Sequence, residues 1–294
     1  MTETPRDEWI TLNGLSFHYR DWGGSGQPIV LLHGLASTCH IWNLVAPILA
    51  EDFSVVALDQ RGHGDSAKPD HGYDFATVSN DLLGLIQAKD IRRAIVVGHS
   101  WGGDVALEFG VANPGTAMGL CFVDGGMIEP SARHASLQQA RDQMAPPVFK
   151  SITREEFSER VRSRHTEDGM GARFAEIVLA NFETLEDNTI RAKLSRDNHI
   201  RIIEALWDHH PPALLPLVKC PVLMMPARRL GNPAAAERDE RRAKSVASAE
   251  ELLPVGKAVW LEDSIHDVPV QRPELVAGVI KEHIHEGFFA QAAG

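Results

Sequence analysis

The sequence predicts an α/β protein with a mostly parallel sheet of about eight strands, flanked by helices and interrupted by a helical insertion. Three observations support this prediction. Short apolar runs alternate with segments of helical periodicity, which is typical of right-handed strand–helix–strand crossovers. The apolar runs disappear between residues 129 and 216, where charged amphipathic segments take over. The motif Gly98-His99-Ser100-Trp101-Gly102 stands between one apolar run and one helical segment.

The N-terminal elements come in a regular order. Residues 9–19 predict two short strands joined at Asn13-Gly14, a dipeptide that strongly favours a tight hairpin. The later apolar runs do not alternate between apolar and polar residues, which indicates strands that are buried on both faces. The strands expected here are Pro28–Leu32, Phe53–Leu58, Ala94–Val97 and Met118–Val123, and the helices are Ile41–Ala50, Thr77–Ala88 and Val105–Ala112.

The remaining chain divides into an insertion and a return to the alternating pattern. We expect residues 1–128 and 217–294 to form the core domain and residues 129–216 to form a helical cap. The helices expected in the cap are Ser131–Gln143, Arg154–Arg164, Ala172–Asn181 and Ile200–Trp207. After it we expect strands at Pro221–Met225 and Lys257–Leu261, and helices at Ala234–Ala249 and Pro273–Phe289.

The composition excludes several classes of function. The chain has 294 residues, of which 44% are hydrophobic and 23% charged, as in ordinary globular proteins. Its formal net charge of −11 argues against binding to nucleic acid or to an anionic membrane. The three cysteines are far apart and form no C-x-x-C motif, which suits a reducing compartment. There is no apparent signal peptide, and no apolar run approaches the roughly 20 residues of a membrane span. We therefore expect a cytoplasmic protein.

The motif around Ser100 predicts a catalytic nucleophile. A G-x-S-x-G sequence between a strand and a helix is the nucleophile-elbow pattern, in which a strained turn lifts the serine hydroxyl above the sheet edge. Side chains at the flanking positions would collide with the strand or the helix, which explains Gly98 and Gly102. The helix that begins here directs free N–H groups and its positive dipole end toward Ser100.

Four motifs resemble the α/β-hydrolase fold superfamily, and in particular its serine esterase-like members with a helical cap. They are LLHGLAS at Leu31–Ser37, DQRGHGDS at Asp59–Ser66, GHSWGG at Gly98–Gly103 and IHDVP at Ile265–Pro269. The resemblance places the insertion where family members carry a cap. It also separates the chain from haloalkane dehalogenases and epoxide hydrolases, which place an aspartate at the position of Ser100.

The resemblance implies a triad in the chain order serine, acid, histidine. His266 is the histidine between the last strand and the final helix, and we expect it to be the base. Many relatives carry the acid after the strand that follows the cap, but residues 226–232 contain no carboxylate. Some members carry it one strand earlier, where this chain has Asp124. We therefore favour Asp124 over Glu237 and Asp239, which lie on a charged helix.

The remaining site residues follow from the same resemblance. The backbone N–H groups of Leu35 and Trp101 are expected to form the oxyanion hole. His33 is expected to order the loop that carries Leu35. Candidate residues of the substrate pocket are His33, Trp42, Met144, Phe149, Met170 and Trp207. All of these except His33 are apolar, and the alternative for them is to pack in the core of the cap.

Together these features predict a serine hydrolase that cleaves a small, mostly neutral carboxylic ester or lactone through an acyl-enzyme. No cofactor and no metal are expected, because the spacing of His199, His209 and His210 matches no ligand motif. The expected partner is the small-molecule substrate, and a homodimer is compatible with the sequence.

Three alternatives remain open. One is a carbon–carbon bond hydrolase acting on a ring-fission-type diketone, for which Arg133, Arg191 or Arg196 could bind a carboxylate. Another is a ligand-binding receptor that turns over little, and a third is cofactor-independent oxygenase or perhydrolase chemistry.

Overall fold

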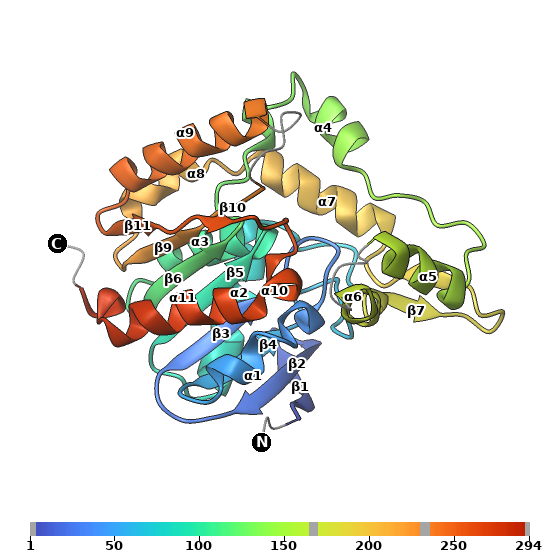
Figure 1. Ribbon diagram of the computed structural model, residues 1–294, viewed down its shortest axis with the longest axis horizontal. Helices are drawn as coiled ribbons and strands as arrows, with labels where there is room; N and C mark the ends of the chain where they lie inside the picture. Colours follow the sequence, from blue (N-terminus) through green and yellow to red (C-terminus); the bar gives the residue numbers. More distant parts are fainter. Residues whose placement is uncertain (1–3, 165–169, 230–235, 292–294) are drawn as a thin grey trace.

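The computed structural model describes residues 4–164, 170–229 and 236–291 and is built around an eight-stranded sheet (Figure 1). The number of strands and the mostly parallel order agree with the prediction. Counted from the edge that holds the N-terminal hairpin, the first two neighbouring pairs of strands are antiparallel and the other five pairs are parallel. In spatial order the strands are β1 (Arg6–Leu12), β2 (Leu15–Gly23), β4 (Ser54–Leu58), β3 (Pro28–Leu32), β5 (Ala94–His99), β6 (Ala117–Val123), β9 (Val222–Met225) and β11 (Gly256–Ala258).

The three central strands end at the same level. Leu32 of β3 pairs with Gly98 of β5, and Gly98 pairs with Phe122 of β6. All six residues of β5 are buried, so this strand is covered on both faces. Because the strands are parallel and in register, the residues that follow them meet at one edge of the sheet.

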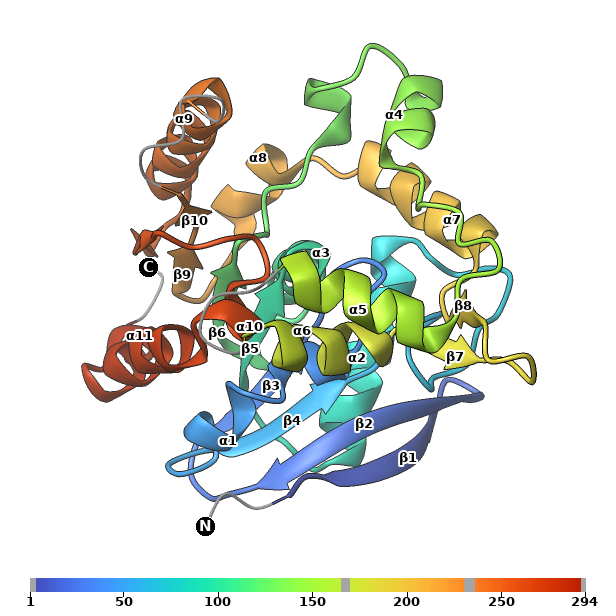
Figure 2. The same ribbon diagram turned by 45° about the vertical axis from the view of Figure 1, so that its right-hand side comes forward.

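Helices cover both faces of the sheet. One face carries α2 (Phe75–Ala88), α3 (Trp101–Ala112) and α9 (Ala236–Leu252), and the other carries α1 (Ala46–Leu49), α10 (Val268–Gln271) and α11 (Pro273–His285). Successive residues of β5 alternate between the two cores: Val96 packs into the first and Val97 into the second. Figure 2 shows the β1–β2 hairpin at one edge of the sheet and α9 with α11 toward the other.

The insertion is mostly helical, and its four longer helices lie together toward the right-hand side of Figure 1. They are α4 (Leu137–Met144), α5 (Arg154–Arg164), α6 (Met170–Leu179) and α7 (Arg196–Trp207), followed by the short α8 (Pro211–Leu214). The expectation that strands are absent here was wrong. A small antiparallel hairpin, β7 (Phe182–Thr184) with β8 (Ile190–Ala192), links α6 to α7, and strands of three residues are too short to show a periodic pattern.

Two elements differ from their predicted bounds near the site. The expected helix at Ile41–Ala50 divides into a 3₁₀ turn, Cys39–Trp42, and α1, because Pro47 lacks an N–H and is tolerated only in a first helical turn. The expected strand at Lys257–Leu261 divides into two strands, β11 and β12 (Leu261–Glu262). β11 pairs with β9 in the main sheet, whereas β12 pairs with β10 (Ala227–Arg228). The predicted start of the next-to-last long helix, Ala234, lies outside the described residues. Within the described ranges, no helix is both long and apolar enough to cross a membrane.

A buried charge cluster attaches both ends of the cap to α3. Asp104 of α3 accepts hydrogen bonds from the backbone N–H of Gly126, at 3.2 Å, and of Ile128, at 2.8 Å, where the chain enters the cap. The buried ring of His209, where the chain leaves the cap, lies 3.4 Å from Asp104 and 3.5 Å from Glu108. Burial lowers the pKa of His209, but the two carboxylates outweigh it and raise this pKa to about 9. The imidazole is therefore a cation at neutral pH.

We expect His209→Gln to destabilise the protein by about 3–5 kcal/mol at neutral pH, because it leaves Asp104 buried without its cation. The raised pKa of folded His209 also predicts a pH dependence. The wild-type stability that it supplies is complete below pH 6.5 and is lost as the pH rises through about 9. Urea unfolding measured on both sides of this window checks the prediction. His210→Gln is the control, because that neighbouring histidine is exposed and pairs with Glu129. Equal stability of both variants would contradict the prediction.

Candidate active site

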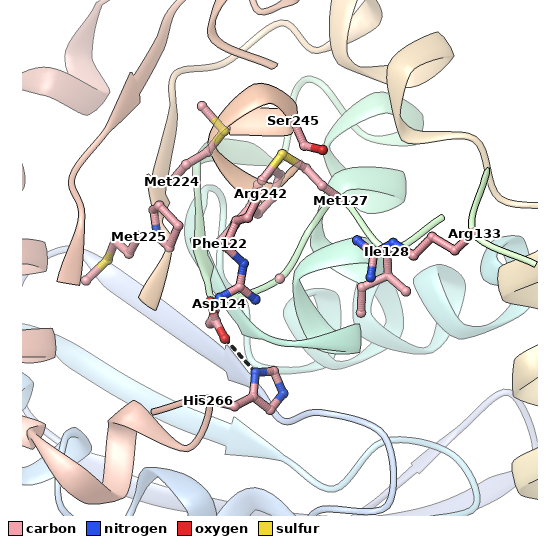
Figure 3. A pocket seen from close by; sticks show the side chains of 12 residues that line it. Phe122, Asp124, Met127, Ile128, Arg133, Met224, Met225, Arg242, Ser245 and His266 are labelled. Carbon is pink, nitrogen blue, oxygen red and sulfur yellow. Dashed lines mark hydrogen bonds and ion pairs between the residues drawn. The ribbon is translucent and has the colours of Figure 1, made fainter. Parts of the chain in front are cut away.

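Ser100, His266 and Asp124 form one hydrogen-bonded row at the edge of the sheet. The Nε2 atom of His266 lies 3.0 Å from Ser100 Oγ. The Nδ1 atom of His266 lies 2.6 Å from Asp124 Oδ2, and Figure 3 shows this bond. The three residues follow β5, β12 and β6, and His266 is 166 residues from Ser100 in the chain. The structure thus brings together the three residues that the sequence nominated as nucleophile, base and acid.

Ser100 occupies a strained turn. Its backbone has φ 52° and ψ −126°, a conformation that only glycine adopts without cost. Its N–H donates to Val123 O at 3.0 Å, which attaches the turn to β6. A Cβ at Gly98 would lie 2.1 Å from Gly102 O, and one at Gly102 would lie 2.6 Å from His33 O. These distances confirm that both flanking positions must be glycine.

Hydrogen bonding determines the charges of the acid and the imidazole. Burial raises the pKa of Asp124, but the bond from His266 and the nearby charge of Arg242 outweigh it, so this pKa lies below its usual value. Burial lowers the pKa of His266, but Asp124 outweighs it, and the pKa of His266 lies above 6.5. Asp124 is therefore ionised, and His266 has an increased affinity for a proton. This is the electrostatic arrangement of a base supported by a carboxylate.

The segment after β9 supplies backbone groups to Asp124 in place of a carboxylate. The N–H of Ala227 donates to Asp124 Oδ1 at 2.9 Å, and Ala227 belongs to β10, which pairs with the strand preceding His266. Glu237, one alternative acid, is exposed on α9 and pairs with Arg241 at 3.0 Å. Asp239, the other alternative, lies on the same helix. Asp124 is the residue whose carboxylate bonds to His266.

The two N–H groups proposed for the oxyanion hole flank Ser100. Trp101 begins α3, and Leu35 follows Gly34, where a Cβ would lie only 2.9 Å from Ser100 Cβ. Among the described residues, neither N–H has a backbone acceptor. The Trp101 indole is buried and stacks on His63 with ring centroids 5.3 Å apart, so it packs in the core.

Two of the six candidate pocket residues were assigned wrongly. His33 and Trp42 have 0% exposure, so neither can line an open pocket. His33 Nε2 accepts a hydrogen bond from the Gln60 N–H at 3.0 Å, and its Nδ1–H donates to Gly34 O at 2.8 Å. Its ring therefore holds the loop that carries Leu35, as expected for its other proposed role. Trp42 packs in the core beneath His99, with ring centroids 6.4 Å apart.

The other four candidates lie in the cap. Phe149 packs edge-on against Phe157 and Phe182 within the cap. Met144 and Met170 pack against the two hydrophobic cores, and Trp207 is half-buried at the end of α7. Their role in substrate binding stays a prediction.

A cavity of about 210 Å³ opens beside Asp124 and His266 (Figure 3). This volume is below the usual range for drug-sized ligands and is large enough for a small acyl or alcohol group. Its walls are mainly apolar, from Phe122, Met127, Ile128, Met224, Met225 and Pro226, and its polar side chains besides the triad pair are Arg133, Arg242 and Ser245.

Two further residues contact the triad, and sequence reasoning missed one of them, Arg242. Arg242 on α9 lies 3.0 Å from Asp124 Oδ1, and His99 donates its Nε2–H to the backbone oxygen of His266 at 2.8 Å. The charged composition of α9 indicated a solvated helix, and nothing in its periodicity distinguishes Arg242 from Arg241. His99 lies within the elbow motif next to Ser100, and this position was the signal in the sequence that its side chain lies near the triad.

One buried group of metal-ligand type occurs in the described part of the chain, comprising His18, Cys39 and Asp59. Asp59 accepts a hydrogen bond from His18 Nδ1–H and one from the Cys39 N–H, both at 2.7 Å. The Asp59 N–H in turn donates to His18 O at 3.0 Å, so these contacts hold the loop after β4 against β2. The donors and acceptors of the group are used by the protein itself.

The parallel sheet, the serine turn and the late histidine define an α/β-hydrolase, and comparison with known proteins agrees. A family model described as "Alpha/beta hydrolase family" matches residues 29–279. The chain therefore belongs to the alpha/beta hydrolase family.

Individual relatives differ in their named activities. A soluble epoxide hydrolase of Corynebacterium sp. is 42% identical over 113 residues, which are 38% of this chain and 39% of that protein. A haloalkane dehalogenase of Mesorhizobium japonicum is 27% identical over 259 residues, covering 86% of this chain and 75% of that protein. The crystal structure of E-2-(acetamidomethylene)succinate hydrolase has a TM-score of 0.77 at 21% identity, covering 96% of this chain and all of that one, and shows the shared fold.

The two histidines at the site should titrate far apart. We expect the pKa of His266 to lie above 6.5 and that of buried His99 to lie at about 4. Histidine ring NMR as a function of pH measures both values without a substrate. In Asp124→Asn the pKa of His266 should fall, because the supporting negative charge is gone. A His266 that titrates at the same pH in both proteins would show that the pair does not interact.

Proposed function

We propose that the protein is a serine hydrolase that cleaves a small, mostly neutral carboxylic ester or lactone through an acyl-enzyme. The observation that carries this proposal is the row of hydrogen bonds from Ser100 Oγ through His266 to Asp124. A serine hydroxyl is a weak nucleophile until a neighbouring base accepts its proton. Here the base is within hydrogen-bond reach, and its other nitrogen bonds to a buried carboxylate.

The reaction follows from these positions. Ser100 Oγ bonds to the carbonyl carbon while its proton passes to His266 Nε2, and the carbonyl oxygen becomes an oxyanion held by the N–H groups of Leu35 and Trp101. The carbon–oxygen bond to the leaving alcohol then breaks, and His266 returns the proton to that oxygen. A water molecule attacks the acyl-enzyme, with His266 again as base, and releases the acid and free Ser100. Asp124 accepts the hydrogen bond from His266 Nδ1–H throughout.

The chemistry of a serine oxygen argues for acyl transfer over the activities named for the relatives. An epoxide or an alkyl halide attacked by Ser100 would leave an ether on the serine, which water does not cleave under mild conditions. An acyl ester on the same oxygen is readily hydrolysed. Ser100 therefore suits an ester or a lactone.

A carbon–carbon bond hydrolase acting on a diketone is the second candidate. It would use the same triad and would need a cation for an anionic substrate. Of the three arginines considered for this role, Arg133 borders the cavity. Arg191 pairs with Glu183 on the exposed cap hairpin, and Arg196 donates to Pro146 O at 2.9 Å. Assays of acyl esters, lactones and vinylogous diketones on the same preparation separate the two candidates.

We also propose a cytoplasmic location. Its support is chemical: Cys39, Cys121 and Cys220 are buried and free, which suits a reducing compartment.

Ser100→Ala should abolish ester turnover without changing the fold, because the variant has no oxygen to acylate. The measurement is hydrolysis of p-nitrophenyl esters, with a covalent serine probe as a second readout and thermal unfolding as the control for folding. Near-wild-type turnover by the variant would refute the proposed nucleophile. A wild-type protein that neither hydrolyses esters nor reacts with the probe would favour a ligand-binding role.

Asp124→Asn should lower kcat by about 10⁴-fold, by analogy with the same change in a serine protease, because the amide no longer selects the imidazole tautomer that accepts the serine proton. Glu237→Gln is the matched control, since it removes a carboxylate that faces solvent on α9. Comparable losses in the two variants would show that Asp124 is not the acid.

A further inference from the structure

The acid of the triad has a second charged partner on the side opposite His266. Arg242 Nη1 lies 3.0 Å from Asp124 Oδ1 and donates a hydrogen bond to Ala227 O at 2.5 Å. The N–H of Ala227 donates to the same Oδ1 at 2.9 Å. One carboxylate oxygen is thus held by an arginine and a backbone amide, and the other, Oδ2, accepts the hydrogen bond from His266 at 2.6 Å.

We propose that Arg242 is a positioning residue of the triad, which holds Asp124 Oδ1 so that Oδ2 faces His266. The inference rests on the proposed function, because it concerns the same three catalytic groups. In Figure 3 the guanidinium of Arg242 reaches from α9 toward Asp124, on the side away from the bond to His266. The helix that follows the cap therefore supplies a positioning group to the triad.

The physical need for this arginine comes from the burial of Asp124. Its side chain is 1% exposed, and an unpaired carboxylate at such a position is strongly disfavoured, because the charge has lost its hydration. His266 is neutral whenever it is ready to accept the serine proton, so it cannot neutralise Asp124 at that stage. Arg242 keeps its charge at every step, because a guanidinium does not deprotonate at working pH. It therefore stabilises the ionised acid while the base is uncharged.

The same arginine opposes protonation of His266. The groups with an electrostatic effect on His266 are Asp124 directly after β6, Asp267 next to His266 in the chain, Arg242 on α9 and His99 on β5. Asp124 and Asp267 raise the pKa of His266, and Arg242 lowers it. Removal of Arg242 should therefore raise this pKa, so that His266 stays protonated and unable to act as base up to a higher pH.

The test compares Arg242→Met with Arg241→Met. Methionine keeps much of the length and apolar volume of the arginine stem and removes its charge. Arg241 is the adjacent arginine on the same helix and pairs with exposed Glu237. In Arg242→Met we expect kcat for a p-nitrophenyl ester to fall by at least about tenfold. The acid limb of the kcat/KM profile and the NMR titration of His266 should both move to higher pH. Arg241→Met should match the wild type in all three measurements.

A third variant separates positioning from a merely structural role. Arg242→Lys keeps the charge and should restore the wild-type titration of His266, while kcat recovers only in part, because an ammonium lacks the planar geometry of the guanidinium. If Arg242→Met is too unstable to purify, the NMR comparison of Arg242→Lys with Arg242→Gln gives the same test.

Two results would overturn the inference. One is an unchanged titration of His266 in a folded Arg242→Met. The other is an increase in KM alone, which would make Arg242 a substrate contact of the cavity. Failure of the proposed function is a separate outcome, because the NMR titration needs no substrate. A wild-type protein without ester turnover, in which His266 still responds to Arg242→Met, would overturn the hydrolase proposal and leave the Arg242–Asp124–His266 coupling in place.

Discussion

The arrangement of the site depends on the backbone turn at Ser100. A residue with a side chain at φ 52° costs about 1–3 kcal/mol, which the surrounding structure must offset. The bond from the Ser100 N–H to Val123 O holds the turn against β6, and glycines at positions 98 and 102 let the strand and the helix approach closely. β3, β5 and β6 end in register, which brings the segments after them together around this turn. His266 contacts the Ser100 hydroxyl, and Asp124 in turn contacts His266.

The loop after β6 joins the site to the cap. It begins with Asp124, whose carboxylate contacts His266 and Arg242, and it continues through Met127 and Ile128, which line the cavity. Two of its N–H groups bond to Asp104 on α3, the helix that directly follows Ser100. One short segment thus connects the acid, the cavity wall and the entry to the cap. A shift of the cap at this point would therefore move the backbone next to Asp124.

Two buried carboxylates near this loop are stabilised by the same physical device. Asp104 has His209 beside it, and Asp124 has Arg242. In each case a cation from a distant part of the chain reduces the cost of burying the charge. Burial still raises the pKa of Asp104 above its usual value, whereas the pKa of Asp124 lies below it. The two differ in purpose under our proposals: the first attaches the cap to the core, and the second keeps the acid ionised while His266 is neutral. Asp124, directly after β6, requires such a partner, because the end of this strand is almost closed to solvent.

The sequence by itself determined the order of the elements, the strained serine turn and the positions of His266 and Asp124 at strand ends. Those features depend on local patterns: apolar runs, flanking glycines, and carboxylates or histidines directly after strands. Only the tertiary structure decided that His33 and Trp42 are buried, that a hairpin interrupts the cap, and that Arg242 rather than Arg241 reaches the acid. These depend on which face of an element packs against a segment far away in the chain. On α9, one position along the helix turns a side chain by about 100°, which separates an arginine in the site from one in solvent.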